Sequence, residues 1–157
     1  MEIKKANLDN PEQVKLLYKA IKTYLGAVRK YIGEYDKKIG DDWIEGLFIG
    51  HLMRCDFDKG GYYEKIEMWT IEKEGKIIGF ANTFPHPPEF ELYPVIDILP
   101  VGRIPLPELA QIFLEVAKKF KEQSYIHIIK NSPLAGQFPK KTKIGEWHAC
   151  DTWKIGI

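Results

Sequence analysis

Between Phe90 and Glu122 the chain passes from an apolar strand through a short turn into an amphipathic helix. The strand runs to Pro100, and the turn covers Val101–Leu106. The helix begins at about Pro107, and its apolar residues recur on one helical face: Leu109, Ile112, Phe113, Val116 and Phe120. Backbone N–H groups and the helix dipole converge on one anion in such an arrangement. The segment therefore suggests a cofactor site at the turn.

The same turn lacks features that phosphate-binding loops normally have. Gly102 is its only glycine, and Pro105 and Pro107 carry no backbone N–H. Close approach to phosphate needs glycine and inward-pointing N–H groups. Glu108 adds a negative charge near the expected anion, whereas Arg103 is suited to act as a phosphate clamp. The turn thus argues both for and against a bound phosphate.

The composition is that of one globular domain without strong charge. The chain has 157 residues, enough for a sizeable core, and a formal net charge of +1, which gives no bulk attraction to nucleic acid. No window approaches the roughly 18 apolar residues of a membrane span, and the N-terminus begins no secretory signal. Cys55 and Cys150 are too few for a disulfide framework. We expect a single cytoplasmic domain, 1–157, without nucleic-acid or membrane partners.

Helical and strand periods alternate along the first half of the chain. A strand is expected around Glu2–Ala6, followed by a helix that Asp9 or Asn10 caps. A second apolar segment, 41–52, predicts another helix. Residues 65–84 alternate between two faces around a tight turn at Lys73–Lys76, which predicts a β-hairpin. A proline-rich connection follows at Phe84–Pro88.

The second half of the chain adds further strands. Tyr125–Ile129 predicts one strand, a loop is expected from Asn131 to about Lys143, and two short strands are expected at Glu146–Ala149 and Thr152–Ile157. The order is one strand, two helices, three strands, one helix and up to three strands. This order predicts an α/β (α+β) fold with a mixed sheet.

This order resembles that of the GNAT-type N-acetyltransferases over nearly the whole chain, and local motifs agree. Ile96–Pro100 is similar to the family's cofactor-facing strand, and Arg103 stands at the family's distance from the proline. Leu106 and Glu108 stand where the family has small residues, so the pyrophosphate-binding loop is a degenerate version of the family's. Asn131 followed by Phe138 is similar to the family's Asn and later aromatic residue, usually Tyr.

The resemblance implies a GNAT-like, largely antiparallel central sheet flanked by helices, with two central strands that splay apart around a thioester. It implies acetyl-CoA as co-substrate and direct attack on the acyl carbon by a small-molecule or protein amine. A homodimer is possible. The alternative is a catalytically inactive GNAT-like binding or interaction module that has lost CoA binding. The implied cofactor contacts are Ile98, Leu99, Val101, Gly102, Arg103, Ile104, Asn131 and Phe138.

Direct transfer needs a base for the ammonium and an acid for the thiolate. Asp97, within an apolar strand, is a candidate base, and the alternative is an Asp bonded to a bulge or loop. Glu91 is a second base candidate, with a solvated charge at the strand edge as its alternative. His127 is a further catalytic candidate, with a satisfied structural histidine as its alternative.

Phe138 has no proton to donate, so Tyr93 and Tyr125, which shares the face of His127, are the candidate acids. The alternative is a thiolate that leaves with the help of water. Asn131 is equally explained by turn chemistry.

A zinc site is the remaining alternative. His51 and Cys55 are four residues apart, and His148 and Cys150 are two apart. Two nitrogens and two thiolates form a valid zinc set. The spacings match no familiar finger or ribbon, so we expect no metal.

Overall fold

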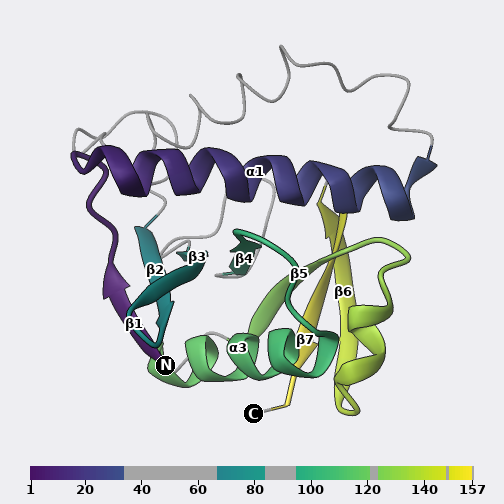
Figure 1. The fold of residues 1–157 in the computed structure, drawn as a ribbon. Coiled ribbons are helices and arrows are strands. Elements are labelled where there is room, and N and C mark those ends of the chain that lie inside the picture. Colours follow the sequence, from purple (N-terminus) through teal and green to yellow (C-terminus); the bar gives the residue numbers. More distant parts are fainter. Residues whose placement is uncertain (34–66, 84–94, 121–123, 148, 157) are drawn as a thin grey trace, which may run out of the picture.

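A seven-stranded sheet lies between two α-helices in the computed structural model, which describes residues 1–33, 67–83, 95–120, 124–147 and 149–156 (Figure 1). The strands are β1 (Glu2–Lys5), β2 (Glu67–Lys73), β3 (Lys76–Thr83), β4 (Ile96–Pro100), β5 (Tyr125–Ile129), β6 (Lys141–Trp147) and β7 (Cys150–Ile155). The helices are α1 (Pro11–Tyr31), α3 (Leu106–Lys119) and the short 3₁₀ helix η2 (Pro133–Gln137).

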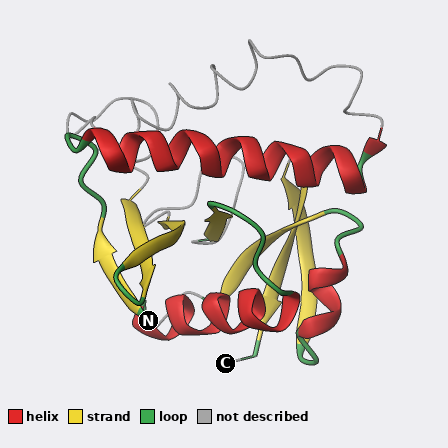
Figure 2. Cartoon of the chain, in the orientation of Figure 1, coloured by secondary structure: helices red, strands yellow, loops and turns green. Residues whose placement is uncertain are grey.

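The strand order is β1-β2-β3-β4-β5-β7-β6. Every neighbouring pair is antiparallel except β4 and β5, which are parallel. Helix α1 covers one face of the sheet and α3 covers the other (Figure 2). The prediction of a mixed, largely antiparallel central sheet flanked by helices is therefore confirmed.

Helix α1 begins where the sequence predicts. The Asn10 side chain caps it by accepting a hydrogen bond of 2.9 Å from the Glu12 N–H, and Pro11 occupies the first turn. One face of the helix is buried against the sheet: Leu17, Ala20, Ile21, Leu25 and Val28. The apolar period of about 3.6 residues therefore determines which face packs.

The predicted β2–β3 hairpin is also confirmed. Its turn residues Glu74 and Gly75 have φ values of 53° and 77°, as a two-residue type I′ turn requires. The register then shifts, because Ile71 pairs with Gly79 but Glu72 pairs with Ile77. Ile78 is thus the extra residue of a β-bulge. Its carbonyl accepts a 2.9 Å hydrogen bond from the Val101 N–H, so the bulge anchors the start of the turn after β4.

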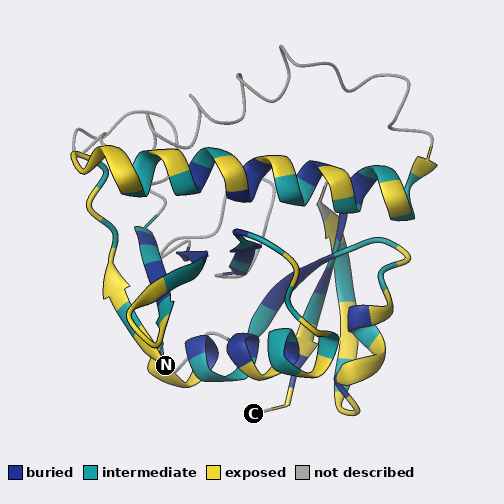
Figure 3. Ribbon diagram, in the orientation of Figure 1, coloured by how far each residue is buried: buried dark blue, intermediate teal, exposed yellow. Residues whose placement is uncertain are grey.

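Two hydrophobic layers hold the helices against the sheet (Figure 3). Strand β4 contributes to both, because successive side chains point to opposite faces. Ile96 and Ile98 pack in the layer under α3, whereas Leu99 packs with Phe80 in the layer under α1. Asp97, between Ile96 and Ile98, therefore points to the α1 face.

The C-terminal region differs from the prediction. The loop expected from Asn131 to Lys143 instead contains η2, whose first turn is capped by Ser132, and β6 already begins at Lys141. β7 likewise begins at Cys150, two residues before the predicted strand. The prediction was wrong because β6 is an edge strand with many charged side chains, which hide the alternation of apolar residues.

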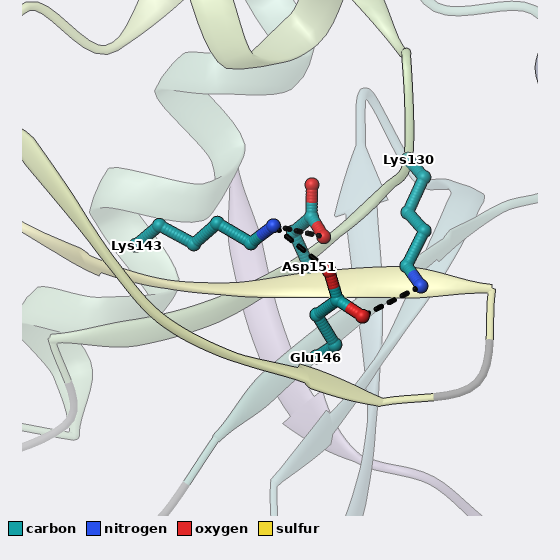
Figure 4. Close-up of polar contacts among 4 residues, drawn as sticks. All are labelled: Lys130, Lys143, Glu146 and Asp151. Atoms are coloured by element: carbon teal, nitrogen blue, oxygen red, sulfur yellow. Dashed lines mark hydrogen bonds and ion pairs between the residues drawn. The ribbon is translucent and has the colours of Figure 1, made fainter.

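Charged side chains of this edge form a small network (Figure 4). Glu146 accepts hydrogen bonds from Lys143 at 2.9 Å and from Lys130 at 3.1 Å. Lys143 also lies 3.3 Å from Asp151 on β7. The hydrogen bond from Lys143 and then that from Lys130 hold the pKa of Glu146 below its usual value. The network therefore ties β6 to β7 and to the turn after β5.

Two expected elements, the second helix at 41–52 and the proline-rich connection at 84–88, lie outside the described residues, as do the candidates Glu91 and Tyr93. Among the helices that the structure describes, none is both long and apolar enough to cross a membrane.

Candidate functional site

The central parallel strands β4 and β5 separate almost as soon as they meet. A single residue pair, Ile96 with Ile126, is in register between them. Residues 97–100 of β4 and 127–129 of β5 have no further pairing with each other, although all of them lie in the described ranges. The sheet therefore opens towards the carboxyl ends of its two middle strands.

Beyond this point, one edge of β4 has no strand partner among the described strands. Asp97, Ile98, Leu99 and Pro100 pair with β3 on the other side. Backbone N–H and C=O groups alternate between the two edges of a strand, so about half of those in β4 point towards the opening. Such an edge binds extended ligands that carry amide groups. Ile98 and Leu99, both predicted cofactor contacts, lie on this stretch.

Asp97 and His127 meet where the strands part. The His127 Nδ1 lies 2.7 Å from Asp97 Oδ1. The imidazole is 2% exposed, whereas the Asp97 side chain is 26% exposed. With Nδ1 protonated, His127 donates to the carboxylate and fixes its orientation. Solvent therefore reaches the Asp97 carboxylate and not the His127 ring. Asp97 is therefore bonded to a side chain on the neighbouring strand, not to a bulge or loop.

Tyr125 lies two residues before His127 on the same face of β5. The strands β4 and β5 pair at Ile126 and part after it. Tyr125 comes before Ile126 in β5, so it lies away from the opening. Its register partner is Lys154 on β7. The structure thus brings Asp97 and His127 together and places Tyr125 on the closed side of the strand pair.

The turn after β4 presents backbone donors. Both backbone groups of Val101 are engaged, the N–H with Ile78 and the carbonyl with the Thr23 hydroxyl at 2.9 Å. The N–H groups of Gly102, Arg103 and Ile104 have no acceptor within the part of the chain that the structure describes. These donors lie directly before the N-terminus of α3, where the helix dipole favours an anion.

Glu108, in the first turn of α3, is paired with a lysine from the β2–β3 hairpin. Lys73 Nζ lies 2.7 Å from Glu108 Oε1. The hydrogen bond with Glu108 raises the pKa of Lys73, which therefore remains charged. The sequence indicated the unfavourable charge of Glu108 but not its counter-charge, since the two residues are 35 positions apart.

The two later cofactor candidates make structural contacts. Asn131 has φ 65°, the left-handed turn conformation that asparagine tolerates, and its Nδ2 donates to the Tyr31 carbonyl at 3.2 Å. Phe138 is 3% exposed and packs edge-on against Phe113, with ring centroids 6.1 Å apart. The structure therefore places Asn131 against the end of α1 and Phe138 in the layer under α3.

Sequence reasoning missed a row of polar residues beside the Asp97–His127 pair. Asn82 on β3 is the register partner of Asp97, and Thr152 on β7 is that of His127. Asn82 is 1% exposed and Thr152 is 4% exposed. The only sequence signal for Asn82 is a polar residue on the buried face of a predicted strand.

The described residues contain no group of three or more His, Cys, Asp or Glu side chains that could hold a metal ion. Of the four zinc candidates, His51, Cys55 and His148 lie outside the described residues. Cys150 is buried, and its Sγ lies 3.3 Å from the Tyr24 hydroxyl.

The mixed sheet, its parted middle strands and the two flanking helices match a GNAT-like fold. Among solved structures, the chain is similar to the PaiA N-acetyltransferase from Thermoplasma acidophilum, determined in complex with coenzyme A. The TM-score is 0.55, with 11% identity over 99% of this chain and 100% of that chain. At this identity the similarity shows the fold. No protein-family model and no curated protein sequence matches the chain.

Proposed function

We propose that this protein is an N-acyltransferase that uses acetyl-CoA and acts on an amine by direct transfer. The observation that carries the proposal is the opening between β4 and β5, with the Asp97–His127 pair where the strands part. The structural neighbour was determined with coenzyme A, which supports the same cofactor here.

Two parts of acetyl-CoA, its pantetheine arm and its diphosphate, have matching groups among the described residues. The amide groups of its pantetheine arm match the unpaired edge of β4, and this match supports an extended arm beside Ile98 and Leu99. Its diphosphate matches the three N–H donors of Gly102, Arg103 and Ile104 and the positive end of the α3 dipole. In this reading Arg103, whose side chain is exposed, adds a charge-assisted contact.

Lys73 lessens the main electrostatic objection to a diphosphate at this turn. Glu108 would repel the anion, but its carboxylate is held by Lys73 at 2.7 Å. The pair as a whole is neutral. Pro105 and Pro107 still remove two possible donors, so we expect weaker binding than a glycine-rich loop would give.

Asp97 is the proposed base. Its carboxylate accepts a proton from the acceptor's ammonium group, and the neutral amine then attacks the acetyl carbonyl carbon. A C–N bond forms, the C–S bond breaks, the nitrogen releases its second proton to solvent to give the amide, and the thiolate takes up a proton from solvent. Acetyl-CoA supplies the acetyl group and the leaving thiolate. His127 acts as a positioning residue, because its Nδ1–H holds the Asp97 carboxylate at the opening.

The first test is the thermal midpoint with and without millimolar acetyl-CoA. A ligand at about a hundred times its dissociation constant stabilises a protein by about 2.7 kcal/mol. For a chain of this size, such a gain raises the midpoint by roughly 5–11 °C. Arg103→Ala should reduce the shift, and Lys15→Ala, which removes an equal charge from an exposed position on α1, should not.

The second test is release of CoA thiol in the presence of a panel of amines, with Asp97→Asn as the matched control. A midpoint shift together with thiol release that depends on Asp97 would support the proposal. No shift for a folded protein would reject it and favour the alternative, a GNAT-like interaction module without CoA, for which Pro105 and Pro107 are the structural argument.

A further inference from the structure

Asn82 is a buried side chain that the proposed mechanism does not use. It lies on β3 between Met68 of β2 and Asp97 of β4, with which it is in register. Its relative exposure is 1%, and neither Nδ2 nor Oδ1 has a protein hydrogen-bond partner among the described residues. Buried carboxamides are normally paired, so a carboxamide with both ends open indicates a group that serves a ligand.

Asn82 points to the same face of the sheet as the proposed base. Met68 and Phe80, which flank it across and along the strands, both pack under α1. Directly opposed residues of antiparallel strands point to the same side, with Cβ atoms about 4.5–5.5 Å apart. The unpaired carboxamide of Asn82 and the carboxylate of Asp97 are therefore neighbours, and of the two side chains Asp97, at 26% exposure, is the one that solvent reaches.

The donor and acceptor pattern of Asn82 selects a ligand. Nδ2 donates and Oδ1 accepts, so a planar amide pairs with both ends at once. An ammonium group only donates and a carboxylate only accepts, so each would leave one end of Asn82 unpaired. A carboxylate would in addition repel Asp97. A polyamine or a free amino acid therefore fits this position less well than an amide does.

We propose that Asn82 binds an amide group adjacent to the reacting amine, so that the acceptor is an α-amino amide. In such a molecule one carbon atom separates the amine nitrogen from the amide carbon. This spacing matches an amine at Asp97 and an amide at Asn82 on the next strand. The N-terminal residue of a peptide and a free amino-acid amide share this chemistry. The assignment rests on the proposed function for the identity of the amine's site.

Binding is measured by calorimetry on the CoA-loaded wild-type protein and two variants. The probes are glycinamide, alaninamide, leucinamide and lysinamide, each compared with the amine that lacks the amide and with the free amino acid. Alanyl-alaninamide separates a peptide from a single amino-acid amide. Asn82→Leu removes both polar ends at similar size, and Met68→Leu is the matched control on the same face.

We expect at least one amide to bind wild type at least tenfold more tightly than its matched amine, and Asn82→Leu to reduce that ratio to below threefold. Met68→Leu should leave the ratio unchanged. Asn82→Leu should also raise the thermal midpoint, because an unpaired buried amide opposes folding. Wild-type binding without preference for any amide would overturn the proposal. An Asn82→Leu variant that keeps the preference for amides would also overturn it. The same holds for an Asn82→Leu variant that loses this preference and has a lower thermal midpoint than wild type.

CoA thiol release is recorded for the same probes and separates the two hypotheses. If the amides bind as expected but none releases thiol, the acyltransferase proposal fails and the amide site at Asn82 stands. If alkylamines without an amide are acetylated as well as the amides by wild type and Asn82→Leu alike, the acyltransferase proposal stands and the amide site is rejected.

Discussion

Removing the Asp97 carboxylate tests the pair on which the proposed mechanism depends. In Asp97→Ala, the His127 Nδ1–H loses a partner 2.7 Å away while the ring stays 2% exposed. A buried donor left without its partner costs about 1–3 kcal/mol of unfolding free energy. For a protein of this size, that corresponds to a fall of roughly 2–12 °C in the thermal midpoint. Asp97→Asn keeps an oxygen acceptor and should cost clearly less.

A double-mutant cycle measures the coupling directly. Urea unfolding of wild type, Asp97→Ala, His127→Leu and the double variant, followed by tryptophan fluorescence, gives four free energies with comparable slopes. We expect a coupling energy of about 1–3 kcal/mol, since the double variant leaves no donor without its partner. Additivity within about 0.5 kcal/mol would refute the argument that the two side chains stabilise each other.

Activity completes this prediction. Asp97→Asn should lower turnover by roughly 10²–10⁴, the usual contribution of a general base, while acetyl-CoA still raises the thermal midpoint as in wild type. Turnover within a factor of three of wild type would remove the assigned role of Asp97.

Three further predictions test the turn, the hairpin and the sheet edge. Arg103→Ala should weaken acetyl-CoA binding roughly tenfold or more, as calorimetry would show, and unchanged affinity would exclude the residue as a phosphate contact. Gly79→Ala should lower the unfolding free energy by about 1–3 kcal/mol, because the added Cβ would lie 3.1 Å from the Leu99 carbonyl oxygen of β4. The control Gly102→Ala adds a Cβ that meets nothing within 4 Å and should be tolerated. Equal thermal midpoints of the two variants would contradict this. Glu146→Gln should be slightly less stable than wild type at neutral pH. Since Lys143 lowers the pKa of Glu146 below its ordinary 4.5, the difference should disappear as the pH falls through the lowered value, and a pH-independent difference would argue against the ion pair.

Local sequence patterns were sufficient to predict those elements that form through contacts between residues close in the sequence. The cap and buried stripe of α1 and the Glu74–Gly75 turn follow from contacts within a few positions. Strand β6 was not predictable in the same way, since a charged edge strand is defined by its partner β7 and not by its own apolar residues.

In the candidate site, too, single residues could be predicted from the sequence, but their partners could not. Asp97 was a candidate from its apolar surroundings, but its partner His127 lies 30 positions away. Lys73 and Glu108 are similarly separated by 35 positions. Asn82 has significance only because the register of β3 and β4 sets it opposite Asp97. Such pairings depend on strand order and register, which no short window of sequence contains.

The parting of β4 from β5 also affects how the protein folds during synthesis. Strands β1–β4 all precede α3 in the chain, whereas β5, β6 and β7 all follow it. The first four strands are therefore synthesised before any strand of the second group. Until β5 arrives, β4 is an edge strand whose residues Ile96, Ile98 and Leu99 are apolar, which is the kind of edge that pairs with other chains. Partly folded chains in which β1–β4 have paired but β5 has not yet docked are thus the stage at which this fold most needs protection from aggregation.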